Sequence, residues 1–243
     1  MGCTWHGKNN KMKKGFCCVS VASVRSAPDH RSEMTTQLLY GETFEVLSAE
    51  QKFLYIRMDF DGYEGWLHYR QADLVSGISS ARTLVTEPFL LTEIAGQKML
   101  LSQGSEQPTT EPFGPLSATE ITDTAKQWLN VPYLWSGRSF FGVDCSGFVQ
   151  MVYKLYGIAL PREAAAQAAV GKVLSFVEES QPGDLAFFDN EEGTIVHVGI
   201  MLSPHQIIHA FGAVRIDEMD SSGIFNKELN THTHRLRMVR SLF

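Results

Sequence analysis

The chain has 243 residues, a formal net charge of −6 and 44% apolar residues. This length and apolar content are sufficient for two domains that each bury a core. The acidic balance, without a basic stripe, excludes a nucleic-acid-binding protein that works through a basic surface. No apolar run reaches the ~18 residues that a membrane-spanning helix needs, so we expect no membrane span.

Cysteine usage and the beginning of the chain indicate the compartment. The four cysteines lack C-x-x-C spacing, so we expect neither a disulfide framework nor a zinc knuckle; they are Cys3, Cys17, Cys18 and Cys145. Met12-Lys13-Lys14 and the apolar residues 15–22 imitate part of a signal peptide, but they start well inside the chain and are more typical of a strand. We therefore expect a cytoplasmic protein, with export as the alternative.

The first ~110 residues have the short alternating runs of an all-β domain. Strands are expected at residues 16–24, 42–48, 53–58 and 63–68, with a tight hairpin at Asp61-Gly62. The Tyr-Glu-Gly-Trp-Leu run at 63–67, following this turn, resembles a bacterial SH3-like domain. A further hairpin through Ala95-Gly96 is expected between residues 83–91 and 98–101. We predict a small SH3-like β-barrel, a fold that more often binds than catalyses.

The domain boundary is expected in a segment rich in proline and glycine. Residues 104–116 contain Pro108, Pro112, Gly114 and Pro115, which is typical of a linker. The predicted organisation is a barrel domain with its extension at 12–103, a linker at 104–116 and a second domain at 117–243.

The second domain begins with helices and continues with strands. A capping-box pattern at 117–120 predicts a helix that presents Ile121, Ala125, Trp128 and Leu129 on one face. A further helix is expected at 163–170. Strands are expected at 185–188, 194–202, 206–211, 214–216 and 234–239. Helices followed by a meander of strands indicate an α+β domain with an antiparallel sheet.

The residue that organises this domain is Cys145, which stands where a Gly-rich segment gives way to a helix. Phe148, Val152 and Leu155 recur at helical spacing, and Gly157 ends the run. Free N–H groups and the helix dipole in a first turn would favour a thiolate. A free cysteine is more often a buried residue that packs like a small apolar side chain. The acid, serine and glycines beside Cys145 are not typical of a helix core, so they favour a reactive cysteine.

Two histidines on later strands complete a possible nucleophilic site. His197 lies within Ile-Val-His-Val-Gly-Ile, and His209 within Ile-Ile-His-Ala-Phe. A cysteine followed by a histidine and by a third polar group that orients it is the arrangement that nucleophilic catalysis requires. An isolated histidine on an apolar strand is more often a hydrogen-bonded core residue. We interpret these two as candidate catalytic residues because Cys145 precedes them in the same domain.

Six motifs in order over about 120 residues resemble the NlpC family of cell-wall cysteine peptidases. They are Pro-Tyr-Leu-Trp-Ser-Gly, Asp-Cys-Ser-Gly-Phe, Leu-Pro-Arg, Gln-Pro-Gly-Asp-Leu, His-Val-Gly-Ile and Ile-Ile-His-Ala. The resemblance implies a papain-like α+β cysteine peptidase domain with a central antiparallel sheet. It also implies that Cys145 is the nucleophile, His197 the general base and His209 the residue that orients His197, with no metal or cofactor.

With the SH3-like domain ahead of it, the chain resembles the subgroup that cleaves murein peptides between γ-D-glutamate and lysine or meso-diaminopimelate. The expected substrates are tri- and tetrapeptides with a free amino-terminal L-Ala, and the product L-Ala-γ-D-Glu would belong to cell-wall peptide recycling. Asp144 and Arg162 have the charges to bind an ammonium and a carboxylate. By the same resemblance, Tyr133, Trp135 and Ser146 line the pocket, and Glu33 and Tyr69 of the SH3-like domain close its amino end.

Other classes stay open on the sequence alone. Cys145, His197 and His209 with a water would also suit catalytic zinc. The SH3-like domain would also suit a wall-binding protein without activity, and the same fold would suit a thiol acyltransferase. His232 and His234, two residues apart and close to Arg235 and Arg237, are interpreted as a solvated strand edge.

Overall fold

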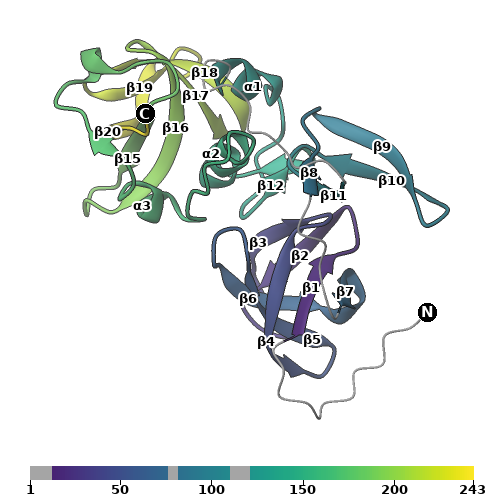
Figure 1. Cartoon of the computed structure of the whole chain (residues 1–243). Helices are drawn as coiled ribbons and strands as arrows, with labels where there is room; N and C mark the ends of the chain where they lie inside the picture. Colours follow the sequence, from purple (N-terminus) through teal and green to yellow (C-terminus); the bar gives the residue numbers. More distant parts are fainter. Residues whose placement is uncertain (1–12, 76–81, 110–120) are drawn as a thin grey trace. The chain divides into compact units, whose positions relative to one another are not determined.

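The computed structural model describes residues 13–75, 82–109 and 121–243. The chain divides into two compact units, Met1–Gly114 and Pro115–Phe243, each described by itself here (Figure 1). None of the helices in the described ranges is long and apolar enough to cross a membrane.

The first unit is built on a seven-stranded antiparallel sheet with the order β3-β2-β6-β5-β4-β1-β7. Every strand contributes at least one side chain to a single buried cluster, which includes Phe44, Ile56 and Leu67. On β5 the inward residues alternate with outward ones, as the period of two along a strand requires. The strands are β1 Lys13–Cys17, β2 Val21–Arg25, β3 Met34–Leu39, β4 Thr43–Glu50, β5 Phe53–Met58, β6 Glu64–His68 and β7 Ala72–Val75, with the 3-10 helix η1 Tyr69–Gln71 before β7.

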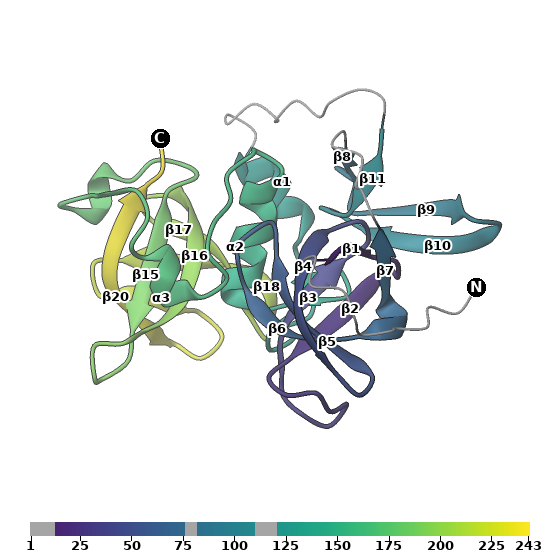
Figure 2. The ribbon, with the colours of Figure 1, turned by 60° about the horizontal axis from the view of Figure 1, so that its bottom comes forward.

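An extension follows the sheet. Strands β9 (Phe89–Ile94) and β10 (Gln97–Ser102) form a hairpin whose turn residues, Ala95 and Gly96, both have positive φ, as the sequence predicts. Strand β8 (Arg82–Leu84) pairs with β11 (Glu106–Pro108). Tyr40, Val85 and Leu101 form a small core for this extension. Figure 2 shows the hairpin as a long pair of strands.

Three predictions in this unit are wrong. The expected strand 83–91 is two strands, because β8 ends at Leu84 and β9 begins at Phe89. The expected strand 16–24 is two strands, because β1 pairs with β4 and β7 whereas β2 pairs with β3 and β6. The turn at Asp61-Gly62 is wider than a two-residue hairpin, since only Gly62 of the pair has a positive φ and Met58 N–H bonds to the Tyr63 carbonyl. Strand β3 was not predicted.

The predicted domain boundaries stay a prediction, because part of 104–116 lies outside the described residues. Within that segment, Glu106–Pro108 is strand β11 rather than irregular chain. The predicted capping box at 117–120 also lies outside the described residues.

The described residues of the second unit form three α-helices. Helix α1 is Ile121–Gln127, α2 is Cys145–Lys154 and α3 is Ala164–Gln167, and α2 is buried along its whole length. All three contact β16, and α2 also contacts β17, as the views in Figures 1 and 2 show. The predicted apolar residues of α2, including Phe148 and Val152, are fully buried, whereas Leu129 beyond α1 is 37% exposed and was wrongly placed on an inward face.

The strands of this unit pair antiparallel, as predicted, and the sheet they form closes into a six-stranded barrel, which was not predicted. The order is β14-β20-β15-β16-β17-β18-β19, and an additional pairing of β19 with β20 joins the ends. Its interior holds a buried cluster with members from all six barrel strands. The strands are β15 Leu185–Asp189, β16 Ile195–Ser203, β17 Gln206–Phe211, β18 Ala213–Asp220, β19 Gly223–Asn226 and β20 Thr231–Ser241, with β14 Lys172–Val173 at the edge.

The remaining pieces are short. Strands β12 (Arg138–Ser139) and β13 (Gly142–Val143) pair just before α2, and the 3-10 helix η3 (Val177–Glu179) precedes β15. Five predicted strands of this domain are confirmed, with β17 in its predicted bounds. The predicted helix 163–170 contains only α3, and β19, which closes the barrel, was not predicted.

Candidate active site

Cys145 is the first residue of helix α2, as the sequence predicts. Asp144 is the N-cap, with an extended backbone, and its carboxylate accepts the Gly147 N–H at 2.7 Å. A Cβ on Gly147 would lie 2.2 Å from the Gly137 carbonyl oxygen, so only glycine lets the first turn approach this loop so closely. The cap and the close contact together fix the position of Cys145.

The predicted substrate-binding pair Asp144 and Arg162 is engaged within the protein. Arg162 donates to both carboxylate oxygens of Asp144, at 2.6 and 3.1 Å, and to Ser146 Oγ at 2.9 Å. Ser136 N–H donates to the same carboxylate at 2.9 Å. The Asp144 and Arg162 side chains are almost fully buried. The structure therefore places the two charges against each other, and their predicted contacts with substrate stay predictions.

Cys145 is a buried thiol with a raised pKa. Burial and the Asp144 carboxylate raise the pKa of Cys145 to about 12, although backbone N–H groups of Val198 and Ser146 hydrogen-bond to the sulfur and lower it in part. The backbone N–H groups at the helix start therefore do stabilise the thiolate, but burial and the Asp144 carboxylate destabilise it more. The resting group is a neutral thiol, and a base has to take its proton. The contact with Val198 also places the sulfur beside β16, at the residue that follows His197 in the sequence.

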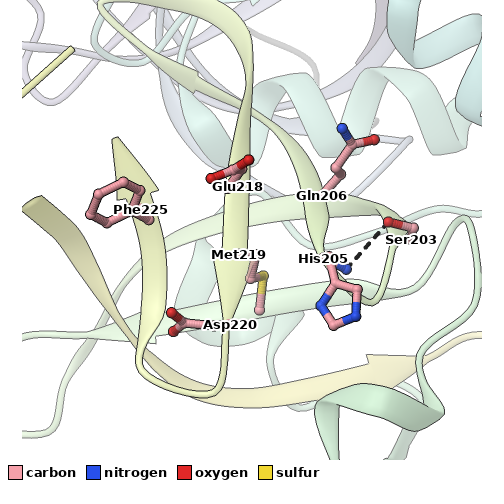
Figure 3. A pocket seen from close by; sticks show the side chains of 7 residues that line it. All are labelled: Ser203, His205, Gln206, Glu218, Met219, Asp220 and Phe225. Carbon is pink, nitrogen blue, oxygen red and sulfur yellow. Dashed lines mark hydrogen bonds between the residues drawn. The ribbon is translucent and has the colours of Figure 1, made fainter. Parts of the chain in front are cut away.

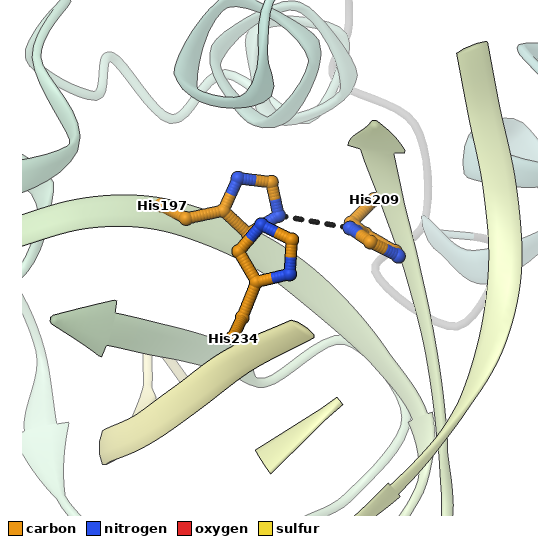
Figure 4. Close-up of side chains that lie close together, drawn as sticks. All are labelled: His197, His209 and His234. Atoms are coloured by element: carbon orange, nitrogen blue, oxygen red, sulfur yellow. Dashed lines mark hydrogen bonds between the residues drawn. The ribbon is translucent and has the colours of Figure 1, made fainter. Parts of the chain in front are cut away.

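His197 and His209 form a hydrogen-bonded pair inside the barrel. They lie on neighbouring strands β16 and β17, where Gly199 is the cross-strand partner of His209, so both side chains share the inner face. His197 Nε2 is 2.8 Å from His209 Nδ1 (Figure 4). Because this hydrogen bond uses Nε2 of His197, the other ring nitrogen of His197, Nδ1, does not take part in it. A Cβ on Gly199 would lie 2.9 Å from that of His209, so glycine makes room for the ring.

Both imidazoles are neutral at physiological pH. Burial, followed by the neighbouring His209 and His234, lowers the pKa of His197 well below its usual value. Burial also lowers the pKa of His209, against the opposing effect of Asp217. A neutral imidazole can accept a proton, so His197 has the protonation state that a general base requires.

His234 is a third histidine in this group, although its sequence neighbours indicate a solvated strand edge. Its ring stacks on that of His197, with centroids 4.1 Å apart and planes 28° apart (Figure 4). Burial and the nearby His209 lower the pKa of His234 to about 4. Only His232 is at an exposed edge, where it pairs with Asp220 at 2.9 Å. The interpretation of both as a solvated edge was therefore wrong for His234.

Asp217 was not recognised from the sequence. Its Oδ2 atom is 3.0 Å from His209 Nε2, and its side chain is 5% exposed. Arg215 makes two contacts with the same carboxylate, at 2.8 and 3.0 Å. His197, His209 and Asp217 are thus linked by hydrogen bonds that run from β16 to β18, and the Cys145 sulfur contacts Val198, the residue after His197.

The geometry does not favour the zinc alternative. Among the described residues, the group of ligand atoms within 4.8 Å of one another comes from His197, His209 and His234, without Cys145. Both ring nitrogens of His209 are engaged in hydrogen bonds. A metal held by this group would have to break one of those bonds.

Comparison with known proteins identifies the family. Residues 130–233 match the NlpC/P60 family, and residues 24–71 match the bacterial dipeptidyl-peptidase Sh3 domain. A gamma-D-glutamyl-L-lysine dipeptidyl-peptidase of Bacillus cereus is 38% identical, with 88% of each chain covered. The chain belongs to the NlpC/P60 family. It is a cysteine peptidase with an N-terminal bacterial SH3 domain, and Cys145 is the one cysteine of the sequence within the matched peptidase segment.

The chain is also similar to a second dipeptidyl-peptidase in sequence and to a solved structure in fold. A gamma-D-glutamyl-L-lysine dipeptidyl-peptidase of Bacillus subtilis is 27% identical over 72% of this chain and 71% of its own length. The crystal structure of an NlpC/P60 family protein from Bacillus cereus superposes with a TM-score of 0.79 at 20% identity, and the match covers 94% of this chain and 99% of that one. This structural likeness supports the fold, an SH3 domain followed by an α+β domain.

The other predicted pocket residues of the NlpC/P60 segment differ in their surroundings. Tyr133 is half-buried, and burial and the charges of Cys145 and Asp144 raise its pKa to about 12, so it lies near Cys145. Trp135 is 62% exposed. Ser146 is buried within the Asp144–Arg162 network. Their roles in substrate binding stay predictions.

Glu33 and Tyr69 lie in the first unit, within the matched Sh3 segment. Glu33 is exposed and precedes β3, and its carbonyl accepts the Ser26 N–H. Tyr69 begins η1, and its hydroxyl accepts a hydrogen bond from Arg70 at 3.1 Å. Their predicted role in binding the substrate stays a prediction.

An open hollow of about 460 Å³ lies at the β16–β17 turn and beside β18 and β19 (Figure 3). None of the predicted site residues of this NlpC/P60 chain lines the hollow. Its lining residues are Ser203, His205, Gln206, Glu218, Met219, Asp220 and Phe225. The hollow therefore gives no support to the predicted catalytic site.

Proposed function

We propose that this NlpC/P60 peptidase hydrolyses the amide bond between γ-D-glutamate and lysine or meso-diaminopimelate in murein peptides with a free amino-terminal L-Ala. The product is L-Ala-γ-D-Glu, and the role is recycling of cell-wall peptides in the cytoplasm, with action after export as the alternative. The observation that carries the proposal is the hydrogen-bonded His197–His209 pair, together with the contact of the Cys145 sulfur with Val198, the residue that follows His197 on β16.

The reaction is an acyl transfer in two steps. Cys145 Sγ attacks the γ-carbonyl carbon of D-glutamate while its proton moves to His197 Nδ1, the nitrogen that His209 leaves free. His197 then returns the proton to the departing amine of the diamino acid. Water, deprotonated by His197, hydrolyses the thioester and restores the thiol. The backbone N–H of Cys145 at the helix start is the expected oxyanion donor, a type of contact worth about 2.7–4 kcal/mol.

The substrate class follows from the relatives. Both named relatives are gamma-D-glutamyl-L-lysine dipeptidyl-peptidases, and the first unit matches the Sh3 domain of bacterial dipeptidyl-peptidases. A dipeptidyl-peptidase has to recognise the free amino group two residues from the scissile bond. This recognition supports the restriction to peptides with free L-Ala.

The test is incubation with L-Ala-γ-D-Glu-L-Lys and with its meso-diaminopimelate counterpart, each with and without amino-terminal acetylation, followed by mass spectrometry. We expect L-Ala-γ-D-Glu from the free peptides only, unchanged activity in chelator and no activity in Cys145→Ala. Cys18→Ala is the matched control, since Cys18 lies in the first unit. Cleavage of the acetylated peptides at equal rates, or transfer of the acyl group to an amine in preference to water, would contradict the proposal.

The predicted role of Glu33 has its own test. If its carboxylate binds the substrate ammonium, Glu33→Ala raises KM for the free-amine tripeptide and leaves the alkylation rate of Cys145 unchanged. Glu50→Ala is the control, because Glu50 is also an exposed carboxylate at a strand end of the first unit. An unchanged KM in Glu33→Ala would reject the role.

A further inference from the structure

Asp217 stands at the end of a chain of hydrogen bonds that leads to the base. From His197 Nε2 to His209 Nδ1 the distance is 2.8 Å, and from His209 Nε2 to Asp217 Oδ2 it is 3.0 Å. All three side chains are buried. The register explains their meeting: His209 is opposite Arg215 on β18, and Asp217 lies two residues further on the same face.

The Asp217 carboxylate determines which atom donates and which accepts in each of these hydrogen bonds. An ionised carboxylate only accepts hydrogen bonds, so His209 has to carry its proton on Nε2. A neutral imidazole then has a lone pair on Nδ1, which accepts from the protonated Nε2 of His197. Nδ1 of His197 is consequently unprotonated, and this is the nitrogen that the proposed reaction uses.

Arg215 keeps Asp217 in the ionised state. Burial alone would raise the pKa of Asp217, but the hydrogen bonds from His209 and Arg215 outweigh burial and lower it below its usual value. Arg215 also pairs with the exposed Glu228 at 3.3 Å. The titratable and charged groups that face the His209–Asp217 contact are Arg215 on β18, His197 on β16 and His234 on β20.

We infer that Asp217 is a positioning residue of this peptidase: through His209 it fixes the proton pattern that leaves His197 Nδ1 free to take the Cys145 proton. The inference rests on the proposed function for its kinetic test. Neither the family match nor the names of the relatives assigns a role to this residue. Its effect on His209 and His197 is a property of the protein without substrate, and so has an independent test.

Asp217→Asn is the informative variant, because an amide has nearly the same shape but can donate. Its NH₂ group would donate to His209 Nε2, which moves the His209 proton to Nδ1. His209 would then donate to His197 Nε2, and the proton of His197 would sit on Nδ1, where it blocks the base. A wrong tautomer of this kind lowered kcat by about 10⁴-fold in a serine protease triad.

The kinetic expectation is a fall in kcat of about 10²- to 10⁴-fold for Asp217→Asn at neutral pH, with KM within about two-fold of the unsubstituted enzyme. The matched control is Asp220→Asn. Asp220 is on the same strand and pairs with a histidine, His232, at 2.9 Å, but both are exposed. We expect kcat of the control to be unchanged. A kcat of Asp217→Asn within two-fold of the unsubstituted enzyme, per folded molecule, would overturn the inference.

The second measurement is the ¹⁵N NMR spectrum of the histidine rings in the full chain without substrate. We expect protonation on Nε2 for His209 and His197 in the unsubstituted protein, and on Nδ1 for both in Asp217→Asn. Protonation of His209 on Nδ1 in the unsubstituted protein would overturn the inference without any variant, even if Asp217→Asn failed to fold.

The two measurements separate this inference from the proposed function. If the unsubstituted protein does not cleave the γ-D-glutamyl peptides but shows the expected ring protonation, the substrate proposal fails and the inference on Asp217 stands. If it cleaves them and Asp217→Asn loses melting temperature but keeps kcat and ring protonation, Asp217 has only a structural role.

Discussion

The state of Cys145 is decided by a competition between two environments. The helix start supplies N–H donors that favour a thiolate, while burial and the N-cap carboxylate of Asp144 oppose a negative charge. Asp144 is held in place by Arg162 and Gly147 whatever the state of the thiol. In the proposed reaction, the proton of Cys145 therefore leaves during the attack on the substrate rather than before it.

Alkylation of the free enzyme measures this state. With a pKa near 12, the thiolate fraction rises about ten-fold per pH unit, so the rate of Cys145 alkylation by iodoacetamide should rise steadily from pH 6 to pH 10. Peptide mapping separates Cys145 from Cys17 and Cys18. Glutathione in the same buffers is the control, with a plateau once its ordinary thiol is ionised. A plateau of the Cys145 rate near pH 6 would show a preformed thiolate and contradict the expectation.

At this scale the sequence predicts residues better than it predicts their states. Cys145, His197 and His209 were proposed because each residue type suits a step of nucleophilic catalysis and each stands in a motif; the structure confirms that His197 and His209 are paired and that Cys145 begins α2. His234 was missed because Arg235 and Arg237 beside it indicate a solvated strand. For Asp217 the sequence contains one weak indication. If cross-strand pairs are counted outward from Gly212 at the β17–β18 turn, Asp217 falls on the same face of the sheet as His209. The raised thiol pKa depends on burial, which no motif encodes.

Among the elements, the start of α2 depends most on one contact. The first turn lies against the loop before it, with Gly147 in the position where a Cβ would be 2.2 Å from the Gly137 carbonyl oxygen and 2.9 Å from Asp144 Oδ1. The backbone cannot yield as a flexible side chain would. The same turn carries Cys145, so a shift there changes both stability and the position of the nucleophile.

Gly147→Ala is expected to lower the free energy of unfolding by about 1–3 kcal/mol, the usual cost of overpacking, and to lower kcat at least ten-fold. Chemical denaturation and steady-state kinetics measure the two effects. Gly193→Ala is the control: no atom would lie within 4 Å of its Cβ, although its φ of +80° makes alanine strained. It should lose some stability and keep kcat. Full activity of Gly147→Ala would show that the helix start adjusts without moving Cys145.

The elements also show why the barrel was not foreseen. Strands such as β5 and β17 have clear β-type runs and were predicted in their observed bounds. The closing strand β19 is short, Gly223–Asn226, and its register with β20 shifts at an irregularity between Ile224 and Phe225. The barrel closes through the pairing of β19 with β20, which are not neighbours in the strand order of the sheet. Local patterns predict strands, but they do not predict which two edges meet.

For the molecule as a whole, ionisable groups are distributed unevenly between the two units. The second unit holds three adjacent imidazoles, two of them buried and that of His234 half-buried, and the pKa values of all three are lowered. Of the histidines in the first unit, burial lowers the pKa of His68, which is only half-buried. Mild acid should therefore weaken the second unit more than the first.

The sign follows from proton linkage. An unfolded histidine has a pKa near 6.5, so between about pH 6.5 and the lower folded pKa the unfolded chain binds more protons, and stability falls as the pH falls. For His234, with a folded pKa of about 4, this window spans about pH 6.5 to pH 4, and its contribution is complete above pH 6.5. Asp217, with a lowered pKa, adds a loss only in stronger acid, below the ordinary carboxyl pKa near 3.9.

Hydrogen exchange followed by mass spectrometry tests this expectation unit by unit. Between pH 7 and pH 5, after correction for the intrinsic exchange rate, protection should fall in peptides from β16 and β17 and change little in peptides from β4 and β5. His234→Gln removes one of the three titrating rings, so its second unit should lose less protection over the same range. Replacement of His232, which is exposed and paired with Asp220, is the control and should leave the pH dependence of β16 and β17 as it is. Equal losses in both units would show that the buried imidazoles do not govern acid stability.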